Sequence, residues 1–145
     1  GINNLLEIFN EKYYQDLEGG ILESLGRLFR YAVKLYVYPM REGAYEKYFT
    51  ESSGTGASIH ALTSNVLINA KNVRVADHIS NLYAHLLENR HIECITGFDE
   101  RVLDIFSRDV LKQIKDKNEL WEKMVPDSVV EAIKRRGLFG HASAS

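Results

Sequence analysis

The sequence predicts an α+β fold that is predominantly helical and contains a small antiparallel sheet. Apolar residues recur every three or four positions through the first and last thirds of the chain, as in amphipathic helices. Short segments between them are rich in β-branched and aromatic residues, which favour strands. The length of 145 residues suits one domain. We place this domain at residues 1–140, with a frayed tail at 141–145.

A pair of helices is expected over residues 4–32. The apolar spacing places one stripe on each helix, and the glycines at 19 and 20 predict the turn between them. The expected stripes are formed by Leu5, Leu6, Phe9, Tyr13, Ile21, Leu22, Leu25, Leu28 and Phe29.

Residues 33–75 are expected to form a hairpin with a long loop. "VKLYVYP" (33–39) predicts a strand that Pro39 ends, and "NVLINAKNVRV" (65–75) predicts a second strand that could pair with it. Residues 41–64 between them hold several glycines and serines without a sustained apolar period. They predict a mobile loop, with room for a short helix through "AYEKYF".

The remaining segments are a helix, a short strand and the C-terminal helices. Residues 76–96 predict a helix that ends near Asn89 and Arg90, followed by a short strand, "HIECIT". The C-terminal helices are expected over 98–137, the first of them starting at Asp99. The last one begins at Pro126, which is tolerated in a first helical turn, and stops at Gly137.

Composition favours a cytoplasmic protein. The net charge of -2 gives no general attraction to nucleic acid or anionic membranes, so nucleic-acid binding is not favoured. A winged-helix arrangement of the 76–96 helix and strand is a further possibility, but this region carries few cations for nucleic-acid binding. No apolar run approaches the roughly 20 residues that span a bilayer, so no membrane partner is expected. The single cysteine, Cys94, suits a reducing compartment.

No motif in the chain identifies a catalytic or metal site. "SSGTGAS" (52–58) lacks the lysine of a phosphate-binding P-loop and is interpreted as a surface loop. The five histidines show no spacing typical of zinc, and Cys94 is interpreted as a small core residue. We therefore predict no catalytic residue and no metal in this chain.

One stretch, "MVPDSVVEAIKRRGLFG" (124–140), resembles the terminal segment of bacterial nicotinate-mononucleotide adenylyltransferases, in which a Val-Pro pair begins the last helix. Upstream, "FSRDVLKQIKDKNELWEKMVP" (106–126) is similar in layout to the ISSTxIR segment of that family. A weaker likeness reaches "NLLEIFNEKYYQDLEGGILESLGRLF", "KLYVYP" and "NLYAHLLENRHIE". The resemblance covers most of the chain and is sharpest from residue 106 onward.

The resemblance implies candidate nucleotide or phosphate contacts. Ser107 and Arg108 match the start of the nucleotide-contacting segment, Lys112 falls near its basic end, and Arg135 and Arg136 form a basic edge. The serines and threonine of ISST are replaced here by Ser107, Arg108 and Asp109, which weakens a direct contact.

The catalytic HxGH motif of the family and its proline-containing phosphate loop are missing from the sequence. The resemblance therefore implies an accessory C-terminal domain in NAD biosynthesis that is not catalytic alone. Its partner would be a nucleotidyltransferase domain of the same parent chain. Magnesium and ATP would belong to that parent enzyme, so no cofactor is expected in this chain. The alternative is a non-enzymatic protein-interaction or oligomerisation domain, which includes a homo-oligomer.

Overall fold

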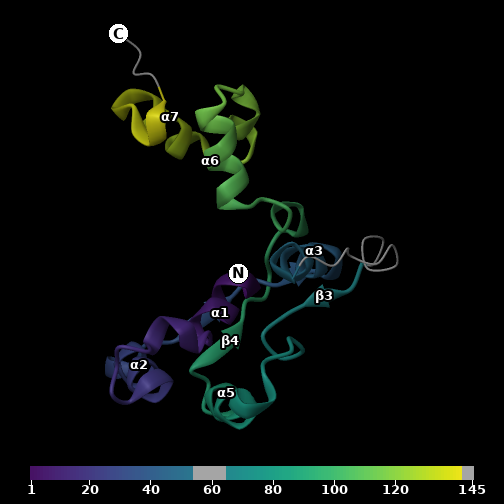
Figure 1. Ribbon diagram of the computed structural model, residues 1–145. Helices are drawn as coiled ribbons and strands as arrows, with labels where there is room; N and C mark the ends of the chain where they lie inside the picture. The colour runs from purple at the N-terminus through teal and green to yellow at the C-terminus, as the bar shows by residue number, and fades with distance from the viewer. Residues whose placement is uncertain (54–64, 142–145) are drawn as a thin grey trace. The chain divides into compact units, whose positions relative to one another are not determined.

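A computed structural model describes residues 1–53 and 65–141 of the chain (Figure 1), and of residues 48–53 it describes only the backbone. The chain divides into two compact units, an N-terminal unit at 1–98 and a C-terminal unit at 99–145. The predicted α+β class, mostly helical with short strands, is confirmed. The sequence predicts one domain over 1–140, and the division falls beside residue 98, where it predicts the C-terminal helices to begin.

Two helices open the N-terminal unit, as the apolar spacing predicts. They are α1 (Ile2–Ile8) and α2 (Gly20–Leu28), with short 3-10 helices η1 (Glu11–Tyr14) and η2 (Arg30–Ala32) after them. Two residues of the predicted stripes are exposed instead: Tyr13 at 57% and Leu22 at 66%. Tyr13 lies in η1, where the tighter 3-10 period no longer continues the stripe of α1.

The strands form two separate pairs. β1 (Leu35–Val37) pairs with β4 (Ile92–Cys94) in parallel, with Tyr36 opposite Glu93. β2 (Met40–Arg41) pairs with β3 (Leu67–Ile68) in antiparallel. The predicted hairpin between the 33–39 and 65–75 segments is therefore wrong in its pairing. Pro39 lies between β1 and β2 and has no N–H to donate, so the chain leaves one pair and enters another.

A helix, α3 (Glu42–Ser53), occupies much of the segment predicted as a loop. The prediction left room for a short helix through 44–49, and α3 contains those residues. The loop prediction is wrong at 42–43 and 50–53, where the helix extends further, because tertiary contacts can override a weak apolar period. The backbone N–H of Glu42 donates to the carbonyl of Val66 at 3.0 Å, which joins the start of this helix to the β3 region. Residues 54–64, which include most of the "SSGTGAS" loop, lie outside the described residues.

The predicted strand over 65–75 shrinks to β3 because asparagine side chains close a turn immediately after it. The Asn72 side chain accepts from the Asn69 N–H at 2.7 Å, and the Asn69 side chain accepts from the Lys71 N–H at 2.8 Å. Such local bonds compete with strand pairing. The helix expected after them is present as η3 (Asp77–Ile79) and α5 (Ser80–Glu88).

Tyr83 of α5 links the core of the N-terminal unit to this turn. Its ring meets Phe9 edge-on at 5.1 Å between centroids, and its hydroxyl donates to the Ala70 carbonyl at 2.6 Å. The other buried apolar residues of this unit are Ile2, Leu5, Leu25, Val37, Met40, Val73, Ile79, Leu86 and Ile92.

The C-terminal unit contains η4 (Glu100–Val102), α6 (Ser107–Lys115), η5 (Glu119–Lys123), α7 (Asp127–Arg136) and η6 (Leu138–Gly140). Asp99 caps η4, so the helix expected from residue 99 begins only at Ser107. Pro126 precedes α7, and Gly137 ends it with φ 59° in the left-handed region, as predicted.

One apolar cluster holds these helices together, formed by Val110, Ile114, Trp121 and Ile133. His141, expected in the frayed tail, lies with its ring 5.9 Å from that of Trp121, while 142–145 lie outside the described residues. Within the described part of the chain, none of the helices has the length and apolar character to cross a membrane.

Candidate functional site

Three of the five candidate phosphate contacts lie on α6. Ser107 and Arg108 are exposed in its first turn, and Lys112 is exposed one turn further on. Arg108 and Lys112 are four residues apart, so they share one helix face. Arg108 also interacts with residues close to it in the chain. Its Nε lies 3.6 Å from Asp109 Oδ1, and its guanidinium lies 5.8 Å from the Phe106 ring centroid.

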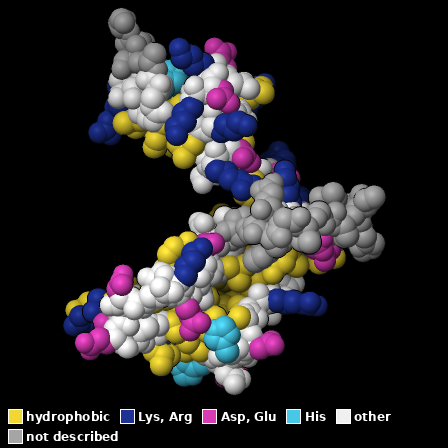
Figure 2. All heavy atoms as spheres, viewed as in Figure 1, with side chains coloured by type: hydrophobic (Ala, Val, Ile, Leu, Met, Phe, Trp, Pro, Cys, Tyr) yellow, Lys and Arg dark blue, Asp and Glu magenta, His cyan; other side chains and the backbone are white. Residues whose placement is uncertain are grey.

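The other two candidates, Arg135 and Arg136, are the last residues of α7. Both are exposed, and Figure 2 shows Lys and Arg side chains spread over the surface of the C-terminal unit. Consecutive helical residues point about 100° apart, so these two arginines diverge. Their neighbour Lys134 pairs with Glu122 at 2.7 Å. The structure therefore brings Arg108 and Lys112 onto one face and separates Arg135 from Arg136.

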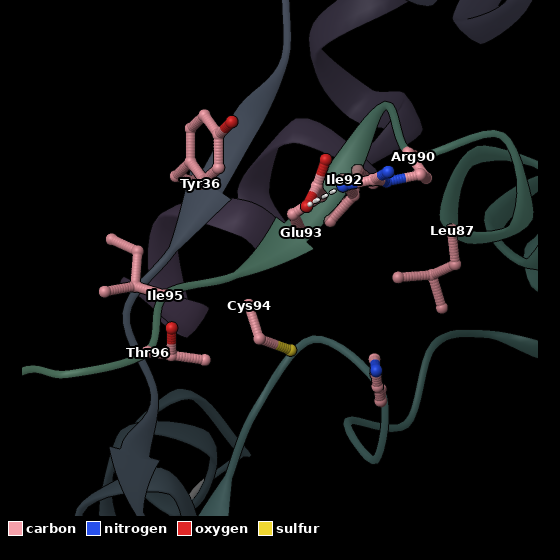
Figure 3. A pocket seen from close by; sticks show the side chains of 9 residues that line it. Tyr36, Leu87, Arg90, Ile92, Glu93, Cys94, Ile95 and Thr96 are labelled. Atoms are coloured by element: carbon pink, nitrogen blue, oxygen red, sulfur yellow. Dashed lines mark hydrogen bonds and ion pairs between the residues drawn. The ribbon is translucent and has the colours of Figure 1, made fainter.

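A second candidate site, which the sequence analysis missed, is a groove of about 670 Å³ along β4 in the N-terminal unit (Figure 3). Successive side chains of a strand point to opposite faces. The cavity is lined by consecutive residues from 92 to 96 and by Tyr36 of β1, so it is not confined to one face of β4 and reaches along its edge. We call it the β4 groove. Its lining residues are Tyr36, Lys71, Leu87, Arg90, Ile92, Glu93, Cys94, Ile95 and Thr96.

Cations dominate the charge of the β4 groove. Glu93 is paired twice, with Lys34 Nζ at 2.9 Å from one carboxylate oxygen and Arg90 Nη2 at 3.3 Å from the other. Hydrogen bonds from Lys34 and then Arg90 hold the pKa of Glu93 below its ordinary value. Glu93 therefore stays ionised and its charge is compensated by two cations. Lys71 adds a further positive charge to the lining.

Arg90 reaches the groove through an unusual backbone conformation. It has φ 58°, a left-handed value that favours glycine, at the position just after the end of α5. Its N–H donates to the Leu87 carbonyl at 3.1 Å, and the next N–H, of His91, donates to Leu86 at 2.9 Å. These two bonds form a Schellman motif, in which the chain reverses and enters β4.

Cys94 lies on the wall of this groove and is only partly buried, so the interpretation as a core residue is wrong. Its Sγ is 3.6 Å from Asn69 Oδ1, a weak hydrogen bond to the asparagine turn. The sequence signal for this site was "ENRHIECIT", a strand with a cation before it. The signal could be recognised only once the pairing of β4 was known, because the pairing decides which edge stays open.

The two candidate sites differ in form, one being a basic helical surface and the other a groove along a strand. Within residues 1–47 and 65–141, whose side chains the structure describes, no group of three or more His, Cys, Asp or Glu side chains is arranged to hold a metal ion. Comparisons of the chain with known protein families, curated proteins and solved structures found no match.

Proposed function

We propose that this chain is a cytoplasmic, non-catalytic accessory part of a nicotinate-mononucleotide adenylyltransferase-like protein. The observation that supports the proposal is that the segment of sharpest resemblance folds as one packed unit. Its Val-Pro pair lies at the start of α7, and its apolar residues Ile114, Trp121 and Ile133 are buried together. The resembling residues thus serve first as a structural closure.

In the parent reaction, ATP and nicotinate mononucleotide would give the dinucleotide and pyrophosphate, with magnesium bound by the parent enzyme. Within this proposal the C-terminal unit contributes packing against the nucleotidyltransferase domain of the parent chain. Arg108 and Lys112 form the basic face that would lie nearest to phosphates, and Arg135 and Arg136 extend the positive surface at the end of α7. The transfer step itself is assigned to the parent domain, because the HxGH motif is absent from this sequence.

The coding sequence upstream of Gly1 tests this proposal. We expect it to encode a nucleotidyltransferase domain with an HxGH motif. If another kind of domain, or a start codon, stands immediately upstream of Ile2, the proposal is refuted. If the upstream sequence does encode that domain, the purified parent protein should form dinucleotide from ATP and nicotinate mononucleotide, whereas residues 1–145 alone should not.

A second candidate function is self-association through the tyrosines around β1. Tyr31, Tyr36 and Tyr38 are 84%, 62% and 43% exposed, and large aromatic side chains are common at protein interfaces. Sedimentation equilibrium of the wild type and of Tyr36→Ser tests it. A concentration-dependent dimer that the substitution weakens would support self-association, and a monomer at all concentrations would exclude it.

A further inference from the structure

β4 pairs with β1 along one of its edges, and its other edge faces away from β1. The Leu35 N–H donates to the His91 carbonyl at 2.8 Å, and the Ile95 N–H donates to the Val37 carbonyl at 3.1 Å. In a parallel pair, the residues that bond to the neighbouring strand alternate with residues whose backbone groups point away from it. Ile92 and Cys94 therefore direct their N–H and C=O groups away from β1.

These outward groups face the β4 groove. Ile92 and Cys94 both line the groove, and Figure 3 shows Leu87 on the side of β4 opposite to Tyr36 of β1. Sheets of globular proteins usually contain more than two strands. Among the described residues no strand other than β1 pairs with β4, and such an unpaired edge is a template for a further strand. The groove thus combines an open backbone edge with space beside it.

The side chains around this edge define what could occupy it. Leu87, Ile92 and Ile95 supply apolar contacts. Lys71 and Arg90 supply positive charge, while the one lining carboxylate, Glu93, already pairs with Lys34 and Arg90. The charge complement of this lining is an acidic partner. A lysine peptide would meet repulsion from the same cations.

We propose that the β4 groove binds an extended acidic segment of a partner protein, which adds to β4 as a further strand. Apolar side chains on alternate positions of that segment contact Leu87 and Ile95, and its carboxylates approach Lys71 and Arg90. The lining runs from Ile92 to Thr96, so roughly five residues, or about 16 Å of strand, are engaged. The cavity of about 670 Å³ lies within the range of about 300–1,000 Å³ typical of ligand sites. This inference does not depend on the adenylyltransferase proposal.

The first experiment measures binding of a fluorescein-labelled, end-blocked peptide of seven residues that alternates valine and aspartate. Fluorescence anisotropy should show saturable binding to the full chain that weakens with added salt, and no comparable binding of the peptide with lysine in place of aspartate. Lys71→Glu should weaken the affinity by about fivefold or more, because it replaces an attraction by a repulsion. The matched control is Arg30→Glu, an exposed arginine outside the groove lining, which should leave the affinity unchanged.

The second experiment tests strand addition directly. Only alternate residues of an added strand bond to β4, so N-methylation of one alternate set of peptide amides should abolish binding while methylation of the other set is tolerated. Amide hydrogen exchange should slow at Ile92 or Cys94 on binding, and should stay unchanged at Tyr36 on the opposite edge.

Four outcomes of these two experiments would overturn the proposal. They are an acidic peptide that does not bind, equal binding of the lysine peptide, tolerance of both methylated peptides, and protection at Tyr36 instead of β4. Displacement of the peptide by inorganic phosphate at matched ionic strength would also overturn it, since the groove would then be a simple anion site.

Discussion

Arg90 Nη2 lies 3.3 Å from Glu93 Oε2, and this ion pair joins the turn that follows α5 to the middle of β4. Arg90 makes the contact from a left-handed conformation, φ 58°, in the position of a Schellman motif where glycine is usual. Arg90 therefore carries a long side chain in a backbone conformation that favours glycine. Backbone strain of this kind often accompanies a functional role for the side chain.

We expect Arg90→Gly to stabilise the N-terminal unit modestly. The left-handed conformation costs a non-glycine residue roughly 1 kcal/mol, which glycine avoids, although glycine also loses more backbone entropy. The ion pair offsets little of this, because the Arg90 side chain is 72% exposed. Urea denaturation should give a gain of about 0.5 kcal/mol. The control, Arg27→Gly within α2, should lose about 1 kcal/mol, and an equal loss in both variants would contradict the strain argument.

Tyr83→Phe should destabilise the N-terminal unit more than its small chemical change suggests. The lost hydroxyl donates to the carbonyl of the fully buried Ala70 at 2.6 Å, and the carbonyl would be left without this partner. Leaving a buried acceptor unsatisfied costs about 1–3 kcal/mol. Chemical denaturation followed by circular dichroism measures the loss. Tyr36→Phe, at an exposed tyrosine, should change the stability by less than about 0.5 kcal/mol.

Ile133→Ala should cost about 2–5 kcal/mol, because Ile133 is 4% exposed and packs in the apolar cluster with Trp121. Trp121 is the only tryptophan of the chain, so its fluorescence reports on the C-terminal unit.

Reversing Arg135 and Arg136 to glutamate should destabilise the unit less than Ile133→Ala does, by roughly 0.3–1 kcal/mol for each charge at the end of α7. Thermal melts with and without ATP or nicotinate mononucleotide compare them. A nucleotide-induced rise in melting temperature that the reversal removes would show that these arginines bind phosphate, and we expect no rise for the isolated chain.

Gly137→Ala should cost on the order of 1 kcal/mol, because Gly137 ends α7 at φ 59°. Gly26→Ala is the matched control. Gly26 lies inside α2 with open space where a Cβ would stand, so alanine should stabilise that helix by roughly 0.5–1 kcal/mol. Equal effects at the two glycines would show that Gly137 does not need its left-handed conformation.

Acid should remove a contribution of Asp99 to stability. Hydrogen bonds from the Arg101 side chain and then from its backbone N–H lower the pKa of Asp99 to about 2 from an ordinary 3.8. A lowered folded-state pKa stabilises the fold above the unfolded value and loses that contribution as pH falls through the folded value. The free energy of unfolding of Asp99→Asn should therefore be lower than that of the wild type at pH 7. The two values should converge as pH falls from about 4 to about 2. A difference that persists unchanged at the acidic end would contradict this, and NMR titration gives the pKa directly.

Local signals were enough to predict the C-terminal unit well. Pro126 and Gly137 mark the two ends of α7, and both act through backbone properties that neighbouring residues cannot change. Strand pairing was not predictable in the same way. β1 and β4 each read as strands, but nothing within either segment reveals that they lie side by side and parallel. The β4 groove depends on that pairing, so local patterns could not predict that Lys71 and Arg90 line the same groove.

The apolar spacing also predicted too much burial at a position beyond the end of a helix. Tyr13 fits the apolar spacing of α1 but follows its end, and so lies exposed in η1. Conversely, the sequence analysis allowed only a short helix through 44–49, and the full extent of α3 was missed because its apolar residues do not gather on one face. Its existence depends on neighbours such as Val66, which the local pattern does not contain.

The pairing of β1 with β4 has a consequence for the order of folding. Lys34 and Glu93, which meet beside this pair, are 59 residues apart in the chain, whereas α6, η5 and α7 contact near neighbours. Folding slows as contacts join more distant residues, because the intervening chain must lose entropy before the contact forms. The C-terminal unit should therefore fold faster than the N-terminal one in isolation. During synthesis the N-terminal unit is made first, but β1 cannot pair until β4 has also left the ribosome. Val37 of β1, which is buried in the fold, lacks the cover of β4 throughout that interval.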